Sequence, residues 1–295
     1  MIGKRVDQIV VGIDGSSSAV DAALWAAAEA ERHRAGLRLV HAFVVPRQIY
    51  PEFVVLESEV RSGMKAQGEQ WLRAAVDAVA EAQPEVRVET ELAEGDAIRI
   101  LLRESVKARL MVLGSRGLGG FTGMLIGSTA VALAAHGKCP TVVVRGQAAV
   151  SGPVLVGCDG SPASEAAVAM AFEEASVRGA PLVAVHAWTD PVAEGAWRLY
   201  PLSISPSELE EDERRALSEQ LAGWQEKYPD VKVQRIVAQG RAVRTLLKFA
   251  ADAQLIVVGS RGRGGFAGMV LGSVSQALVY HAPCPVVVTR PSNAS

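Results

Sequence analysis

Short apolar runs and longer segments with a helical repeat alternate along the first half of the chain. Runs such as IVVGID at 9–14 are rich in β-branched residues and end at glycine or serine, which is typical of strands buried on both faces. In the segments between them the apolar residues recur at helical spacing, and Ser17 or Ser18 is placed to cap the first helix. The pattern predicts strands at 9–14, 37–45, 86–92, 110–115 and 141–145, and helices at 17–34, 60–82, 96–108 and 127–135.

The second half repeats this order. Apolar runs at 154–159, 182–188, 231–237, 255–260 and 286–290 are separated by helical segments that start at Ser164, near Glu208 and at Arg241, and by one that follows a second glycine-rich stretch. Strands that alternate with helices at this spacing are joined by right-handed crossovers into a parallel sheet with helices on both faces. The predicted fold class is therefore α/β, with two tandem, doubly wound, five-stranded Rossmann-like domains.

A duplicated glycine-rich segment shows that the halves have a common origin. Residues 114–128 read GSRGLGGFTGMLIGS and residues 259–273 read GSRGRGGFAGMVLGS, an offset of 145 (259 − 114 = 145) with eleven of the fifteen positions identical. The same offset joins Asp14 to Asp159 and His41 to His186. A repeat of this length is a whole domain and not one unit of a solenoid. We expect domains at 1–146 and 153–292, with a linker at 147–152.

Composition excludes several classes of partner and compartment. The chain has 30 basic and 32 acidic residues, a formal charge of −2, so long-range attraction to nucleic acid or to an anionic membrane is not expected. No run reaches the roughly 18 apolar residues of a membrane span, and the N-terminus has no signal-peptide pattern. We therefore expect a cytoplasmic protein. Its three cysteines are widely spaced and are interpreted as small apolar core residues.

The topology predicts where a ligand would bind. Doubly wound sheets bind ligands beyond the carboxyl ends of their strands, where the loops after the first and fourth strands meet. Those loops carry Asp14 and the glycine segment. Glycines after a strand, followed by a helix start, allow main-chain amides to converge on an anion, so the expected guest is a phosphate chain.

Two familiar phosphate-binding motifs do not fit. The Walker A loop requires a lysine before its hydroxyl residue, whereas Gly127 and Gly272 are followed directly by serine. The Rossmann fingerprint places its glycines after the first strand, but here that turn reads GIDGSSS and the glycine loop comes late in each half.

The spacing G-x-x-G, nine residues, then G-S occurs at Gly114, Gly117 and Gly127-Ser128 and again at Gly259, Gly262 and Gly272-Ser273. With the strand-ending aspartates, the VHA of each second strand and the Cys-Pro before each last strand, this pattern resembles the universal stress protein family, in its tandem, ATP-binding branch. The resemblance covers nearly the whole chain. It implies an adenine-nucleotide-binding fold and two ATP molecules per chain, each with or without Mg²⁺.

The resemblance also assigns the nucleotide-binding residues. The glycine loop and the serine that opens the next helix would hold the triphosphate, the early glycine and aspartate would lie beside the ribose or a phosphate-bound metal, and the backbone at the second strand would meet adenine. In the first half these residues are Gly12, Asp14, Ala42, Gly114, Ser115, Arg116, Gly117, Leu118, Gly119, Gly120, Gly127 and Ser128; in the second they are Gly157, Asp159, Ala187, Gly259, Ser260, Arg261, Gly262, Arg263, Gly264, Gly265, Gly272, Ser273 and Val274.

Other polar residues have two interpretations each. Arg116 and Arg261 either donate to phosphate oxygens or are solvated loop arginines. His41 and His186 are interpreted as satisfied core histidines and not as catalytic bases. The acidic run at 210–213 is most simply a solvated helix face.

The predicted function is an ATP-binding regulator of a stress or growth-arrest response, without a catalytic residue or a dedicated metal site. Asp14 and Asp159 are the obvious carboxylates near the loops, which suits binding better than turnover. The alternative is a weak ATPase or a nucleotide-dependent transferase. A protein with vacant loops is a third possibility. We also expect the halves to form a pseudo-dimer through their last strands, and leave open a homodimer of full chains and an unidentified regulatory protein partner.

Overall fold

Helices and parallel strands alternate along the chain in the computed structural model, which describes residues 7–46, 57–117, 126–146, 151–189, 206–263 and 271–291. The chain divides between Val144 and Arg145 into two compact units. The first contains β1 (Gln8–Gly12), α1 (Ser17–His33), β2 (Gly36–Phe43), α2 (Glu57–Ala82), β3 (Val88–Glu94), α3 (Ala97–Glu104), β4 (Leu110–Gly114), α4 (Ser128–His136) and β5 (Thr141–Val144). The second contains β6 (Val154–Cys158), α5 (Pro162–Arg178), β7 (Leu182–Trp188), α6 (Pro206–Lys227), β8 (Val233–Gln239), α7 (Ala242–Ala250), β9 (Leu255–Gly259), α8 (Ser273–His281) and β10 (Val286–Thr289).

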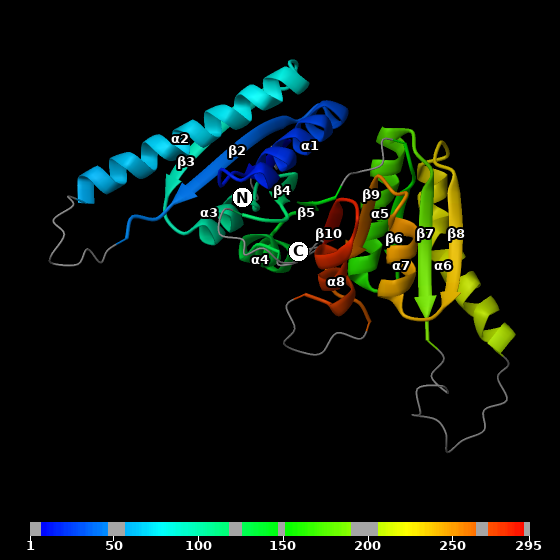
Figure 1. The fold of residues 1–295 in the computed structure, drawn as a ribbon. Coiled ribbons are helices and arrows are strands. Elements are labelled where there is room, and N and C mark those ends of the chain that lie inside the picture. The colour runs from blue at the N-terminus through cyan, green and yellow to red at the C-terminus, as the bar shows by residue number, and fades with distance from the viewer. Residues whose placement is uncertain are drawn as a thin grey trace, which may run out of the picture. The chain divides into compact units, whose positions relative to one another are not determined.

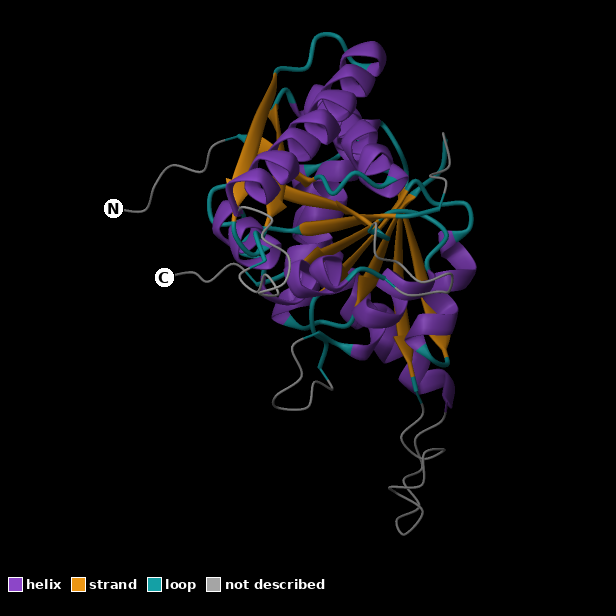
Figure 2. Ribbon diagram, turned by 60° about the vertical axis from the view of Figure 1, so that its left-hand side comes forward, coloured by secondary structure: helices purple, strands orange, loops and turns teal. Residues whose placement is uncertain are grey.

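Each unit has the doubly wound topology that the sequence predicts. The strand order is β3-β2-β1-β4-β5 in the first unit and β8-β7-β6-β9-β10 in the second, and every pairing within a unit is parallel. The order reverses between β1 and β4, and between β6 and β9. Helices cover both faces of the strands, with α1 and α2 on one side of the first unit and α3 and α4 on the other (Figures 1 and 2).

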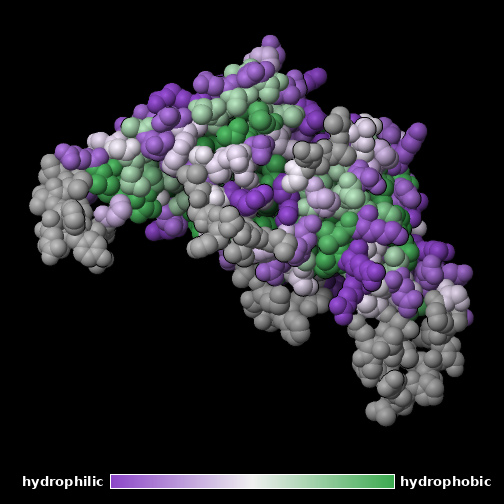
Figure 3. Space-filling model, in the orientation of Figure 1, coloured by the Kyte–Doolittle hydropathy of each residue, from purple (hydrophilic) through white to green (hydrophobic). Residues whose placement is uncertain are grey.

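The central strands are apolar because both of their faces are covered. All four residues of β5 and of β10 are buried, as are the first four of β4 and of β9. The edge strand β3 carries Glu89 and Glu91, both of which pair with Arg38 on β2. Charged residues at an edge discourage pairing with another chain. The outer side of α2 is also hydrophilic, as the purple residues along it in Figure 3 show.

Several helix ends and caps differ from the sequence prediction, and three of these differences have a clear local cause. Ser16, and not Ser17 or Ser18, caps α1, because its side chain accepts the Ala19 amide at 3.2 Å. The helix expected from Ser164 begins at Pro162, since Ser161 caps it and proline is favoured in the first turn. The helix expected to reach Ala108 ends at Glu104, where the Ser105 hydroxyl donates to the carbonyl of Leu102.

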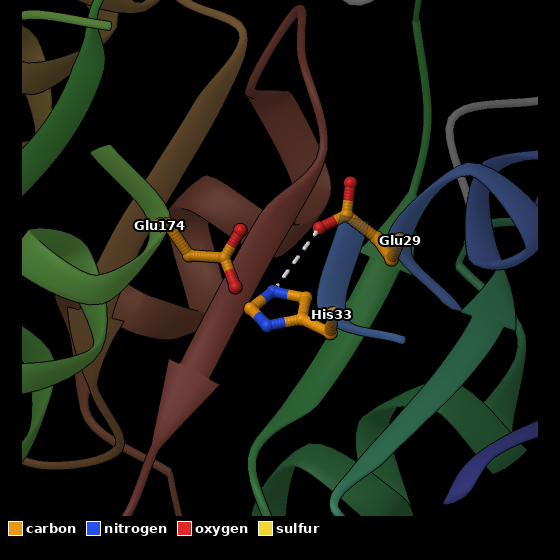
Figure 4. Close-up of side chains that lie close together, drawn as sticks. All are labelled: Glu29, His33 and Glu174. Atoms are coloured by element: carbon orange, nitrogen blue, oxygen red, sulfur yellow. Dashed lines mark ion pairs between the residues drawn. The ribbon is translucent and has the colours of Figure 1, made fainter. Parts of the chain in front are cut away.

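Each unit also contains a buried glutamate near the end of its first helix. Glu29 in α1 lies 2.5 Å from Arg32 Nη1 and 3.9 Å from His33 Nε2, and Figure 4 shows the Glu29 and His33 side chains pointing toward each other. At the equivalent place in α5 (29 + 145 = 174), Glu174 accepts from Arg178 Nε at 3.2 Å. Buried carboxylates require such partners.

None of the described helices combines the length and the apolar character that crossing a membrane requires.

The packing of α5 on α6 gives a stability prediction. Phe172 is fully buried and stacks on Trp224 and Tyr228, with ring centroids 6.3 and 5.9 Å away. We expect Phe172→Ala to lower the free energy of unfolding of the second unit by about 3–5 kcal/mol, because it leaves a cavity in the core. Urea denaturation followed by circular dichroism would measure it. Val177→Ala, on the exposed side of α5, is the control, and equal midpoints for the two variants would contradict the packing described here.

Candidate functional site

The turn after the first strand of each unit holds an aspartate in a fixed position. Asp14 Oδ1 accepts the Ser16 amide at 3.0 Å and the Ser16 hydroxyl at 2.6 Å, and the same hydroxyl oxygen caps α1. In the second unit Asp159 Oδ1 accepts the Ser161 amide at 3.0 Å. Gly15 and Gly160 make the turn possible, since their φ angles of 86° and 72° are unfavourable for other residues.

The loop after the fourth strand lies beside this turn in both units. The Ser16 hydroxyl donates to the Arg116 carbonyl at 3.2 Å, and Ser161 donates to Arg261 in the same way at 3.3 Å. This proximity follows from the parallel pairing of β1 with β4 and of β6 with β9, which aligns the carboxyl ends of the paired strands.

At two positions of each loop, close contacts leave no room for a residue larger than glycine. A Cβ on Gly114 would lie 2.5 Å from the carbonyl oxygen of Ser18, at the start of α1. A Cβ on Gly117 would lie 2.5 Å from Asp14 Oδ2, and a Cβ on Gly262 would overlap Asp159 Oδ2. The loop main chain therefore approaches the carboxylate more closely than any side chain would allow.

The two ends of each glycine loop are joined at its base. The Gly127 amide donates to the Ser115 carbonyl at 3.1 Å, and the Gly272 amide donates to the Ser260 carbonyl at 2.7 Å. Gly127 and Gly272 are also the N-caps of α4 and α8, and neither helix has a side-chain cap. The first amides of a helix carry partial positive charge and lack helical acceptors, so these helix starts suit an anion.

A pocket opens at this place in each unit. The first has a volume of about 110 Å³, and the second about 540 Å³. Both are lined by the turn after the first strand, the end of the second strand, the glycine loop and the starts of two helices. The predicted residues that line them are Gly12, Asp14, Ala42, Gly114, Arg116, Gly117 and Gly127 in the first, and Gly157, Asp159, Ala187, Gly259, Arg261, Gly262, Arg263, Gly272, Ser273 and Val274 in the second.

Other predicted residues do not line the pockets. Ser115 and Ser260 serve the base of the loop instead, where their carbonyls accept the glycine amides, and Ser260 is only 2% exposed. Ser128 is absent from the lining of the first pocket, although the equivalent Ser273 lines the second. The remaining five predicted positions, Leu118, Gly119, Gly120, Gly264 and Gly265, lie outside the described residues.

The third helix of each unit also lines the pocket, which was not predicted from the sequence. Ala97 and Leu101 of α3 line the first pocket, and Ala242 and Leu246 of α7 line the second. These residues are identical at the 145-residue offset and follow a strand that ends at the same edge of the sheet. Their spacing of four places both on one helix face. The repeat itself could therefore have identified them.

The second pocket has one more arginine in its lining than the first, Arg263, together with one more carboxylate, Glu213. Asp96 caps α3 by accepting the Arg99 amide at 2.9 Å, whereas its counterpart in α7 is Arg241, which provides no side-chain cap. The guanidinium of Arg263 lies against Gly160, and its amide donates to Asp159 Oδ2 at 3.1 Å. Burial and the nearby charge of Arg261 lower the pKa of Arg290. A site with clustered guanidinium groups favours a polyanion.

The two second-strand histidines have different surroundings. His41 is 5% exposed, bonds Nδ1 to the Ile13 carbonyl at 2.7 Å and meets the Trp71 ring edge-on, as a core histidine would. His186 makes the matching bond to Cys158, but its Nε2 lies 2.8 Å from Glu213 Oε2, and both residues line the second pocket. The interpretation of Glu213 as part of a solvated helix face is therefore wrong.

The described cysteines are structural. All three are buried and none forms a disulfide, and burial raises the pKa of Cys158 and of Cys284 to about 12. Because the thiolate is the reactive form, these two thiols are poor nucleophiles near neutral pH.

The sequence matches the universal stress protein family over residues 5–145 and again over 151–290. It is 42% identical over 291 residues to a universal stress protein of Mycolicibacterium smegmatis, with 96% of this chain and 97% of the relative covered. It is 41% identical over 293 residues to universal stress protein Rv2623 of Mycobacterium tuberculosis, with 96% of each covered.

Solved structures show the same fold. A universal stress protein from Archaeoglobus fulgidus matches 97% of this chain and 99% of its own length, with a TM-score of 0.73 at 18% identity. The functionally unknown protein PA1789 from Pseudomonas aeruginosa matches 98% of this chain and 94% of its own, with a TM-score of 0.62 at 17% identity. With two matches that together span nearly its whole length, the chain belongs to the universal stress protein family.

Proposed function

We propose that each half of this protein binds one ATP and that nucleotide occupancy of the two sites regulates a stress or growth-arrest response. The observation that carries the proposal is the pocket found in both units, where a glycine loop, the uncapped start of a helix and an aspartate converge. Main-chain amides at a helix start bind phosphate without requiring a basic side chain.

The order of the strands predicts where each part of the nucleotide would lie. Phosphates would lie on the glycine loop after β4 or β9 and at the start of α4 or α8. The nucleoside would extend over the end of the first strand toward the second, where Ala42 and Ala187 line the pockets. Neighbouring parallel strands are about 4.8 Å apart, so two strand spacings provide roughly 10 Å for this extension.

The aspartate also fits a phosphate-bound magnesium ion. Asp14 and Asp159 lie beside the glycine loop and offer carboxylate oxygens, which are the ligands that Mg²⁺ prefers. When bound, Mg²⁺ would neutralise part of the phosphate charge. The turn hydrogen bonds from Ser16 and Ser161 would keep the carboxylates oriented toward it.

Replacing one loop glycine in each half tests the location of the phosphate sites. Because a Cβ would displace the aspartate, we expect Gly117→Ala and Gly262→Ala each to remove one of two bound ATP molecules and the double variant to remove both. Native mass spectrometry would count the nucleotides and titration calorimetry would measure their affinity. Gly63→Ala and Gly223→Ala are matched controls, since nothing lies within 4 Å of their new Cβ atoms. An unchanged affinity in the double variant would reject these loops as phosphate sites.

The extra arginine of the second pocket, Arg263, gives a prediction about affinity at that site. With the first loop blocked by Gly117→Ala, we expect Arg263→Leu to weaken ATP binding at the second site about three- to tenfold at low salt, through loss of a charged donor. The loss should shrink as salt screens the charge. Arg215→Leu, an equal charge change on the exposed side of α6, should have little effect. Equal losses for the two variants would show that Arg263 does not face the phosphates.

The enzyme alternative predicts a different outcome from binding alone. Each aspartate already accepts hydrogen bonds in its turn, and Asp159 uses its second oxygen for Arg263, which suits orientation better than proton abstraction. We expect ATP bound to the protein to stay intact during incubation with Mg²⁺, with phosphate release measured by a colorimetric assay. Sustained release over many turnovers, lost in Asp14→Asn and Asp159→Asn, would favour a weak ATPase.

A further inference from the structure

The halves differ on the helix that covers the second strand, beside the proposed nucleoside end of the pocket. At the 145-residue offset, Gly68 of α2 corresponds to Glu213 of α6, and Trp71 corresponds to Ala216. Neither substitution is conservative. At the first position glycine is replaced by a carboxylate, and at the second an indole ring is replaced by a methyl group. Gly68 and Trp71 lie beside His41, and Glu213 lies beside His186.

In the first unit these residues close the space beside the histidine. The Trp71 ring lies against Gly15 and meets His41 edge-on, with 5.2 Å between ring centroids. Gly68 allows His41 to approach the helix, since a Cβ there would lie 2.5 Å from His41 Cδ2. Among the described residues, none from α2 lines the first pocket. The nucleoside end of that pocket is therefore formed by strands and by apolar residues of α3.

In the second unit the same space is open and polar. Glu213 and His186 line the pocket, with side chains 25% and 12% exposed, and they are joined at 2.8 Å. His186 Nδ1 must donate to the Cys158 carbonyl, so Nε2 and the carboxylate share a proton. This bond fixes the position of Glu213, and a carboxylate with one oxygen engaged still has acceptor capacity for a ligand.

The end of β7 provides a second observation. Trp188 lines the second pocket, and in the described part of the chain its indole Nε1 is buried with no hydrogen-bond acceptor. The corresponding residue of the first unit is Phe43, which has no donor. A buried indole N–H normally finds a partner. An acceptor on a ligand would satisfy it.

We propose that the second half selects its nucleotide through hydrogen bonds to the nucleoside, with Glu213 as the specificity-determining acceptor, whereas the first half has no equivalent side-chain acceptor. The proposal rests on ATP binding as proposed above. The ligand group is an N–H or O–H donor of the nucleoside, either the amino group of the base or a ribose hydroxyl. His186 positions Glu213, and Trp188 offers the complementary donor.

The test compares ligands that lack one donor at a time. In the Gly117→Ala background, titration calorimetry would measure the affinity of ATP, of purine riboside triphosphate, which has no 6-amino group, and of 2′-deoxy-ATP and 3′-deoxy-ATP. We expect one of these analogues to bind about tenfold more weakly than ATP, because it removes the donor that would bond to the second oxygen of the Glu213 carboxylate. Weaker binding of purine riboside triphosphate would identify the base amino group as the donor to Glu213. Weaker binding of a deoxy analogue would identify a ribose hydroxyl instead. In the Gly262→Ala background, where the first site remains, we expect no such difference.

Variants at Glu213 then link the selectivity to the carboxylate. Glu213→Gly, which installs the residue of the first half, should weaken ATP and abolish the difference between ATP and the analogue. Glu213→Gln keeps the size of the side chain and therefore controls for a folding defect in Glu213→Gly. It should reduce, but not remove, the difference in affinity between ATP and the analogue. Glu211→Ala, an exposed position of the same helix, should leave it unchanged.

Two results would overturn the inference while ATP binding stands: equal affinities of all four ligands for the second half, or selectivity that persists in Glu213→Gly. Absence of ATP binding by both halves of the unmodified protein would instead reject the proposed function, and this inference with it.

Discussion

The parallel pairing of the first and fourth strands in each unit is the constraint on which the site depends. It aligns the end of β1 with the end of β4, and the end of β6 with that of β9. The aspartate turn and the glycine loop can then share hydrogen bonds although about a hundred residues separate them. The glycines follow from this arrangement, because two main-chain segments and a carboxylate occupy a space that leaves no room for a Cβ. Without this strand pairing the glycine loop would not lie beside the aspartate turn.

The fold and the location of the site could be predicted because both depend on strong, local signals. Apolar β-branched runs indicate buried parallel strands, and the topology of a doubly wound sheet then places its ligand pocket. The 145-residue offset provided a second copy of each signal, so that Asp14 and Gly117 could be checked against Asp159 and Gly262. The ends of the helices were predicted less well, since the cap at Ser16 depends on which of three neighbouring serines faces the helix amides.

The role of Glu213 could not be predicted from its sequence neighbourhood. It lies in a run of four acidic residues, and only the packing of α6 decides which of them faces inward. Leu217 and Leu221 are buried, and Glu213 lies one helical turn before Leu217 on the same side. The duplicate copy was no help here because the first half has Gly68. Divergence between repeats thus hides the residues that distinguish the two pockets, while the shared residues describe what the pockets have in common.

The hydrogen bonds of the aspartate turn give the pocket a mechanical connection to the rest of each unit. Ser16 bonds to Asp14 and at the same time caps α1, a helix of 17 residues that is about 25 Å long at 1.5 Å per residue. A ligand that displaces the carboxylate would therefore take away an acceptor of the hydroxyl that caps the helix. In the second unit the Ser161 amide bonds to Asp159, and the Ser161 hydroxyl oxygen caps α5. Each of these helices thus begins at the pocket and carries its buried glutamate in its last turns.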